Sequence, residues 1–354
     1  MKKILICLIL FLFLTTIIPT EKIKSRSFTK KIQDIFADEE QLYGGFRPEE
    51  MDLEDDSFHK SKKTTFMEWW YFHTILDKNL SLKIGFHRYE IMSLDLLTAD
   101  INIYKNGDLT HFERKIYTFN QVFISEEKPL IKIEEKTVLK GQMDEKTGRI
   151  IYNVDLKLDK LKANLSFINT TQGWKGETQV SNWGVMLPNP RVDGYIQVDD
   201  EKIMVNGTGY HDHNWNVSFA SFTNFGWLWG KIVSENYTII WANIFKNKFS
   251  GTPLLVINEK NDGFYNINEQ NLKISVSDFY IKKGLIIPTG VSIQADQQDV
   301  SIDLDMEQSS MHHKTIAFMV KYWRYHMETK GEIKIGLKTE EINAISISEL
   351  MRFR

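Results

Sequence analysis

The sequence has 354 residues, more than one hydrophobic core usually supports, so its length predicts two domains. Hydrophobic residues make up 42% and charged residues 26%, which excludes a disordered or low-complexity chain. The net charge of −3, without a basic run, argues against a nucleic-acid partner. The single cysteine, Cys7, lies near the N-terminus, so no cysteine-based chemistry is expected in the rest of the chain.

Residues 1–24 are predicted to be a signal peptide or membrane anchor. Lys2 and Lys3 precede a mostly apolar run from Ile4 to Ile18, which as a helix of about 22 Å is shorter than a hydrocarbon core of about 30 Å. No small-residue cleavage motif follows, so secretion and anchoring at the outer face of the membrane both stay open. We therefore expect an exported protein, with membrane association through this segment as one alternative.

Residues 25–63 are interpreted as a polar N-terminal segment whose acidic stretch, residues 49–56, is solvated. From Glu68 onward the hydrophobic pattern has a period of two. Leu82, Ile84 and Phe86 alternate with polar residues or glycine, which predicts a strand with one buried and one exposed face. Residues 152–159, 301–306 and 333–337 show the same alternation.

Turn signals separate these runs, for example Asn106-Gly107-Asp108, Asp199-Asp200 and Asn261-Asp262-Gly263. Long amphipathic helices do not alternate with the runs, so a parallel sheet is disfavoured. The sequence predicts an all-β protein of two antiparallel barrels or sandwiches. Leu187-Pro188-Asn189-Pro190 is the expected boundary, which gives domains of residues 64–187 and 188–354.

The segment from Glu68 to His73 opens the first strong strand. In a strand Glu68, Trp70 and Phe72 face one side, whereas Trp69, Tyr71 and His73 face the other, and one side would be packed core. The rings can simply fill a barrel, but a carboxylate among them needs a partner or a raised pKa.

A second cluster runs from Gly207 to Trp215. An extended backbone places His211, His213 and Trp215 on one face, with Tyr210, Asp212 and Asn214 on the other. Trp227 and Trp229 share a face shortly afterwards. Ionisable groups interleaved with indoles are typical of an apolar small-molecule pocket with a few polar anchors.

The pair His211-x-His213 also raises the question of a metal ion, with His326, His87 or Glu68 as a third ligand. The interpretation preferred is that these histidines hydrogen-bond Asp212 or nearby backbone, so neither a metal nor another cofactor is predicted.

In the segment from Tyr322 to Met327, Arg324 alternates with rings and lies near His326. Arg324 could be the counter-ion of Glu68 or Asp212. A surface position with its stem across aromatic faces is the preferred interpretation.

The sequence resembles the carotenoid hydratase/AttH family. The resemblance rests on Glu68-Trp69-Trp70-Tyr71, Asn189-Pro190-Arg191, Asp212-His213-x-Trp215 and Trp227-x-Trp229, in matching order over roughly residues 64–354. It implies two consecutive lipocalin-like antiparallel β-barrels and a hydrophobic substrate. Known activities in the family are hydration of an isoprenoid double bond and, in related fungal proteins, cycloaddition, whereas many members have no clear activity.

Two functions from different classes follow. As a hydratase-type lyase, the protein would use Asp212 as the acid, Glu68 as its alternate or as a base that orients water, and His211 and His213 to set protonation. A purely structural envelope protein, a further alternative, would have no accessible cavity, whereas a carrier would hold an isoprenoid or lipid without reaction. In either case the expected ligand-binding residues are Trp69, Trp70, Tyr71, Tyr210, Trp215, Trp227, Trp229, Arg324 and His326.

Overall fold

The computed structural model describes residues 45–61, 65–76, 80–91, 94–179, 181–218, 226–246, 251–260, 263–282, 285–316 and 320–353. Most of these residues are in β-strands, and their helical elements are the short 3₁₀-helices η1 (Leu53–Asp56), η2 (Phe119–Gln121) and η4 (Glu269–Asn271). Over the same ranges we find no helix with the length and apolar character needed to cross a membrane. The predicted leader lies outside the described residues.

The first sheet comprises fourteen antiparallel strands among the described residues. Its main order is β5-β4-β3-β2-β14-β13-β10-β9-β8-β7-β6, and β12, β11 and β1 extend from the second half of β14. The strands are β1 (Glu49–Glu50), β2 (Thr65–Ile75), β3 (Leu80–Ile91), β4 (Leu94–Lys105), β5 (Asp108–Thr118), β6 (Val122–Ile124), β7 (Leu130–Ile133), β8 (Lys136–Met143), β9 (Ile150–Lys157), β10 (Leu161–Ile168), β11 (Trp174–Glu177), β12 (Asn182–Leu187), β13 (Arg191–Val198) and β14 (Glu201–Ser218).

The second sheet has nine antiparallel strands within the described ranges, in the order β18-β17-β16-β15-β23-β22-β21-β20-β19. They are β15 (Gly226–Val233), β16 (Tyr237–Phe245), β17 (Gly251–Glu259), β18 (Phe264–Ile267), β19 (Leu272–Lys282), β20 (Leu285–Gln297), β21 (Val300–Ile316), β22 (Val320–Ile335) and β23 (Lys338–Arg352).

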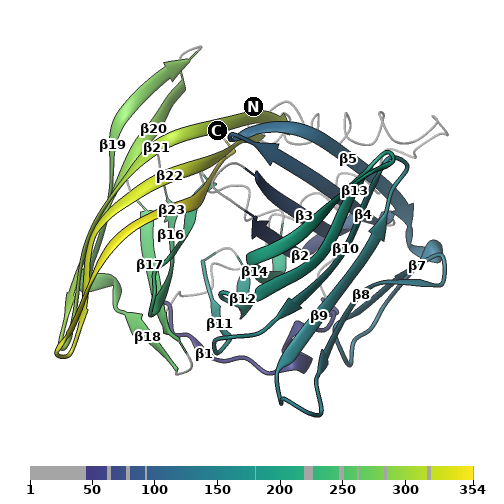
Figure 1. The fold of residues 1–354 in the computed structure, drawn as a ribbon, viewed down its shortest axis with the longest axis horizontal. Helices are drawn as coiled ribbons and strands as arrows, with labels where there is room; N and C mark the ends of the chain where they lie inside the picture. Colours follow the sequence, from purple (N-terminus) through teal and green to yellow (C-terminus); the bar gives the residue numbers. More distant parts are fainter. Residues whose placement is uncertain are drawn as a thin grey trace, which may run out of the picture.

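Both sheets curl strongly and lie side by side, the first in purple to teal and the second in green to yellow (Figure 1). The predicted all-β class with two antiparallel barrel-like units is confirmed. The change of sheet, however, falls between Ser218 and Gly226, after the boundary expected at residues 187 and 188. The reason is that β13 and β14, which follow Pro190, pair back onto β10 and β2 of the first sheet.

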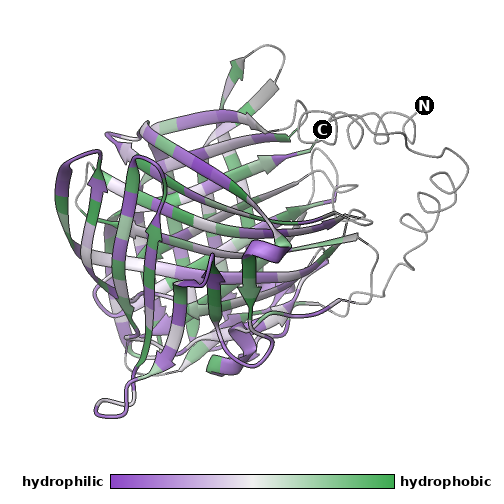
Figure 2. Cartoon of the chain, turned by 90° about the vertical axis from the view of Figure 1, so that its right-hand side faces the viewer, coloured by the Kyte–Doolittle hydropathy of each residue, from purple (hydrophilic) through white to green (hydrophobic). Residues whose placement is uncertain are grey.

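Each sheet encloses its own hydrophobic core, and a third apolar cluster lies between the sheets. Leu82, Ile84 and Phe86 belong to the first core, and Ile302 and Leu304 to the second, as the alternation predicted. The alternation is visible along the strands in Figure 2. The third cluster contains Phe46, Tyr71, Trp174, Trp183, Val185, Tyr210, Trp229, Ile240, Ala242, Ile244, Leu254, Val256 and Ile347.

Two details of the alternation were predicted incorrectly. Ser81 and Lys83 were expected on an exposed face, but both are buried, and Lys83 Nζ donates to Asp100 Oδ1 at 2.9 Å. Their face is covered because the second sheet lies against it: Ser81 Oγ is 3.1 Å from His326 Nε2. Leu337 was expected in a strand, but it is fully exposed in the turn after Ile335.

Polar side chains join the two sheets at several points. Trp174 Nε1 donates to Asn258 Oδ1 at 3.1 Å, and Asn258 Nδ2 donates to the backbone oxygen of Gln172 at 2.7 Å. Lys231 of β15 donates to Asn189 Oδ1 at 3.2 Å and to the backbone oxygen of Gly209. Because burial disfavours the charged ammonium, the pKa of Lys231 falls to about 7.

Lys231 should give the folding stability a specific pH dependence, which Lys231→Met should remove. Between pH 7 and 10 the unfolded chain keeps the lysine proton and the folded chain does not, so the free energy of unfolding rises with pH by at most about 1.4 kcal/mol per unit. Below that window both states hold the proton, so the contribution is flat. Urea unfolding of both proteins across pH 6–10 measures the difference. Parallel profiles would contradict the assignment.

Candidate functional site

The candidate site is built on the neighbouring strands β2 and β14. They pair antiparallel, with Tyr210 opposite His73, Asp212 opposite Tyr71 and His213 opposite Trp70. Opposite residues of an antiparallel pair face the same side, and successive residues alternate. This register therefore divides the predicted site residues between the inside of the first sheet and the surface that faces the second sheet.

Asp212 lies on the surface between the sheets. Its Oδ2 accepts hydrogen bonds from Trp183 Nε1 at 2.9 Å and from the Tyr210 hydroxyl at 2.8 Å. Its Oδ1 is buried and has no hydrogen-bond partner among the described residues. Burial raises the pKa of the Asp212 carboxyl to about 7, against the smaller opposing effect of the two hydrogen bonds.

Aromatic rings from both sheets surround this carboxyl. The Tyr210 ring lies 5.0 Å from Trp229 of the second sheet, 5.2 Å from His73 and 6.2 Å from Tyr71. Trp229 also packs edge-on against Tyr71 and His73, at 6.0 Å in each case. Four rings thus form a continuous apolar surface beside Asp212.

His73 completes this group as a neutral imidazole. Burial lowers its pKa well below the usual value, and the charges of Lys231 and Arg324 act in the same direction. Both ring nitrogens of His73 are buried and have no hydrogen-bond partner within the described ranges. His73 can therefore accept one hydrogen bond and donate another without breaking an existing one.

Arg324 lies at the same interface but pairs with Glu349, not with Glu68 or Asp212. Its guanidinium is fully buried and bonds Glu349 Oε1, and its Nη1 also donates to the Tyr71 hydroxyl at 2.8 Å. The hydroxyls of Tyr71 and Tyr322 each donate to Glu349 Oε1 at 2.7 Å. The surface position preferred from the sequence is wrong, because the side chain of Arg324 in β22 points toward the first sheet and is covered by it.

The opposite face of β14 holds a separate buried network. His213 Nε2 lies 2.8 Å from Glu68 Oε1, and His213 Nδ1 lies 3.2 Å from Asp56 Oδ1. His211 Nε2 lies 3.0 Å from Asp56 Oδ2, which also accepts a hydrogen bond from the Tyr152 hydroxyl at 2.7 Å. This network is part of the interior of the first sheet.

The carboxylates and imidazoles of this network shift one another's pKa values. Burial alone would raise the pKa of Asp56, but the nearby His211 and the hydrogen bonds from His211 and His213 hold it well below its usual range. Burial would likewise lower the pKa of His213, but hydrogen bonds to Asp56 and Glu68 raise it to about 9. The ionised forms of Asp56 and His213 are thus stabilised by their contacts within the network.

The structure brings together only part of the predicted set. The face between the sheets holds Tyr71, Tyr210, Asp212, Trp229, Arg324 and His326, as well as the pair Trp69 and Trp227, whose rings stack at 6.4 Å. The interior of the first sheet holds Glu68, Trp70, His211, His213 and Trp215.

Two expectations therefore need correction. Glu68 and Asp212 do not share an apolar hollow, because one faces the interior of the first sheet and the other faces the second sheet. His211 and His213 bond Asp56, Glu68 and the Tyr71 backbone, not Asp212.

Sequence reasoning also missed several residues of both networks. Asp56 was taken as solvated, yet it is fully buried by η1 packing against the first core. Trp183 and Glu349 stand in strands without a recognised motif, and Lys231 follows the Trp227-x-Trp229 motif by two residues without being part of it. His73 had a usable signal, since it shares the predicted face of Trp69 and Tyr71.

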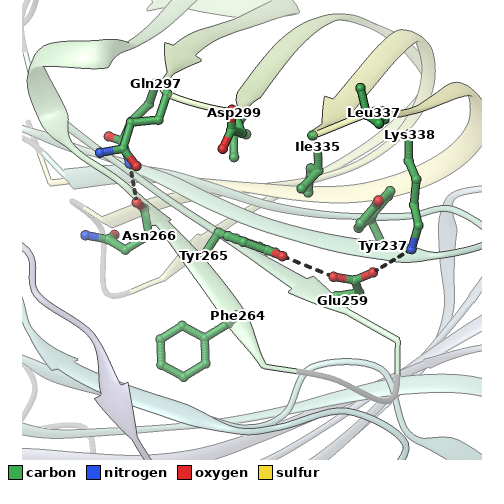
Figure 3. Close-up of a pocket in the computed structure, with 13 residues that line it drawn as sticks. Tyr237, Glu259, Phe264, Tyr265, Asn266, Gln297, Asp299, Ile335, Leu337 and Lys338 are labelled. Atoms are coloured by element: carbon green, nitrogen blue, oxygen red, sulfur yellow. Dashed lines mark hydrogen bonds and ion pairs between the residues drawn. The ribbon is translucent and has the colours of Figure 1, made fainter.

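A cavity of about 720 Å³ lies away from both networks. Figure 3 shows Glu259 in its lining, where Glu259 accepts a hydrogen bond from the Tyr265 hydroxyl and pairs with Lys338. The lining residue Ile335 is separated from Arg324 by eleven positions along β22, about 36 Å. The cavity lining contains none of the predicted site residues, so we do not assign the candidate chemistry to it.

Known proteins resemble this chain in structure but not in sequence. No family model matches the sequence, and no curated protein matches it significantly. A candidate AttH from Nitrosomonas europaea superposes with a TM-score of 0.60 at 14% identity, over 81% of this chain and 92% of that chain. CghA, in its structure with Sch210972, gives a TM-score of 0.59 at 9% identity, over 82% of this chain and 89% of that chain.

Kievitone hydratase from Nectria haematococca also matches, with a TM-score of 0.49 and 11% identity over 81% of this chain and 88% of that one. The resemblance expected from the sequence is confirmed at the level of the fold: the chain has the AttH-like lipocalin fold, with two curled antiparallel sheets in tandem.

Proposed function

We propose that the protein binds a hydrophobic small molecule, isoprenoid or lipid-like, between its two sheets and adds water to a carbon–carbon double bond of it. The observation that carries this proposal is the position of Asp212. Its carboxyl group is buried, has one oxygen without a partner in the described part of the chain, and lies beside the aromatic rings of both sheets. The interface between the sheets, and not the interior of either sheet, is the proposed site.

Asp212 would be the proton donor. A carboxylic acid in apolar surroundings can protonate an alkene carbon, and the new C–H bond leaves a carbocation on the neighbouring carbon. The faces of Trp229 and Tyr210 stabilise that positive charge. Water then forms the C–O bond and releases a proton that returns to the Asp212 carboxylate, so the acid is restored.

His73 would orient the attacking water. It is a neutral imidazole with two nitrogens available for hydrogen bonds, and its ring stacks on Tyr210, the residue that holds Asp212. We do not assign Glu68 to this reaction, because it lies on the other face of the β2–β14 pair. His211 and His213 are likewise assigned a supporting role, behind the strand that carries Asp212.

The alternative is a non-catalytic carrier of the same class of ligand. Export, which the leader predicts, favours it because an exported protein is separated from intracellular biosynthetic enzymes. A carrier would use the same rings but would need no proton transfer from Asp212. Removing the acidic proton of Asp212 would therefore stop the reaction of a hydratase but would leave the function of a carrier intact.

Asp212→Asn should abolish hydration and keep ligand binding. The amide has nearly the same shape but cannot supply the proton, so we expect turnover to fall by at least about 100-fold. Product formation from a panel of isoprenoid alkenes, followed as the mass gain of one water, measures turnover, and quenching of tryptophan fluorescence measures binding. Asp296→Asn, at an exposed position of β20, is the matched control.

Equal turnover in wild type and Asp212→Asn would contradict the catalytic role. Ligand uptake by both proteins without product from either would identify the carrier.

Trp229→Leu should weaken ligand binding by about tenfold, because it removes the indole that contacts the other three rings beside Asp212. Trp241→Leu removes a fully buried indole from the core of the second sheet and is the control for lost stability. We expect Trp241→Leu to lower the melting temperature and leave affinity unchanged in the folded protein. Similar affinities for both variants would argue against a ligand at the interface.

A further inference from the structure

A group of potential metal ligands lies outside the proposed reaction site. His59, Glu68 and His213 each offer one ligand atom, and these atoms lie within 4.8 Å of one another. His59 follows η1, whereas Glu68 and His213 belong to β2 and β14. Three segments that are distant in the sequence therefore converge on one point inside the first sheet.

Two atoms of this group lack the partners that buried polar atoms normally have. Glu68 is fully buried, and its Oε2 has no hydrogen-bond partner in the described part of the chain. His59 Nδ1 is also buried and makes no hydrogen bond there; its nearest acidic atom is Glu68 Oε1 at 3.4 Å. A buried polar atom without a hydrogen-bond partner is destabilising, so a ligand that satisfies both atoms would be stabilising.

The surrounding residues hold the three side chains in place. Asp56 Oδ1 lies 3.2 Å from His213 Nδ1, which leaves His213 Nε2 directed at Glu68. A carboxylate behind a histidine is the usual support of a metal-binding imidazole. The backbone N–H of His59 donates to Glu68 Oε1 at 2.9 Å, and the His59 ring stacks on Trp215 at 4.2 Å.

We propose that His59, Glu68 and His213 bind a divalent transition-metal ion, zinc being the best match. Two imidazole nitrogens and one carboxylate oxygen are a zinc donor set that leaves one position open. Ligands of a tetrahedral zinc ion lie roughly 3.3–3.6 Å apart, since each is about 2.0–2.2 Å from the metal.

The 3.4 Å separation of His59 Nδ1 and Glu68 Oε1 already matches this spacing, and the 2.8 Å separation of His213 Nε2 and Glu68 Oε1 must widen by about 0.5–0.8 Å. Because a metal-binding imidazole nitrogen carries no proton, a proton on His213 Nε2 is released to solvent when the ion binds. His59, whose side chain is 28% exposed, provides the route of entry from solvent.

This ligand set differs from the one that the His211-x-His213 motif suggested. Both nitrogens of His211 are already engaged, with Asp56 and with the backbone oxygen of Tyr71, so His211 supports the site but is not a ligand. His326 contacts Ser81 at the interface between the sheets, on the other side of the β2–β14 pair.

Zinc titration of the chelator-stripped full-length protein, in competition with a chromophoric chelator, tests the proposal. We expect one zinc per chain with a Kd below about 1 µM. His59→Ala and Glu68→Gln should each weaken binding by at least about tenfold. His111→Ala, which changes an exposed histidine of β5, should bind zinc like wild type.

His59→Ala is the decisive variant, because His59 lies in a partly exposed segment and its loss should not prevent folding, which circular dichroism can verify. A folded His59→Ala protein with wild-type zinc affinity would overturn the proposal. So would a wild-type protein that binds zinc no more tightly than about 100 µM. The group would then be a purely hydrogen-bonded network of Asp56, His213 and Glu68.

Discussion

The pairing of β2 with β14 is the constraint on which the rest of the structure depends. Side chains alternate along both strands, so one register decides which groups enter the first sheet and which meet the second. In the observed register, Asp212 and Tyr71 meet the second sheet, and His213 and Glu68 enter the first. A shift of one residue would exchange the two sets and leave both carboxylates without the partners that bury them.

The same pairing keeps two kinds of chemistry apart. On one face, Asp212 has an oxygen that no described residue bonds and lies among aromatic rings, an environment that favours the neutral acid. On the other face, Asp56, Glu68 and His213 bond one another, an environment that favours charged groups and cations. The backbone of one strand separates them, so neighbouring residues such as Asp212 and His213 have opposite electrostatic surroundings. The second sheet completes the first environment by supplying Trp229, Arg324 and Glu349.

Much of this arrangement could be predicted from the sequence, and the remainder has a physical reason. The period of two predicted the all-β fold. It also predicted that Tyr210 and Asp212 lie on one face of a strand and His211 and His213 on the other, because alternation is a local property of an extended chain. The packing of one sheet on another is not local. Ser81 and Lys83 have the pattern of an exposed face and are buried only because the second sheet covers them. Asp56 stands in an acidic segment and is buried only because His211 and Tyr152 provide its partners. Arg324 is paired with Glu349 by the register of β22 and β23, which the spacing of the motif does not encode.

The central claim is that a hydrophobic ligand binds between the sheets and against Asp212. A crystal structure of the protein soaked with farnesol, a fifteen-carbon isoprenoid alcohol, tests this directly. We expect ligand density between β14 and β15, in contact with Asp212 and Trp229. Ligand density confined to the interior of the first sheet, or to the cavity beside Glu259 and Lys338, would contradict it.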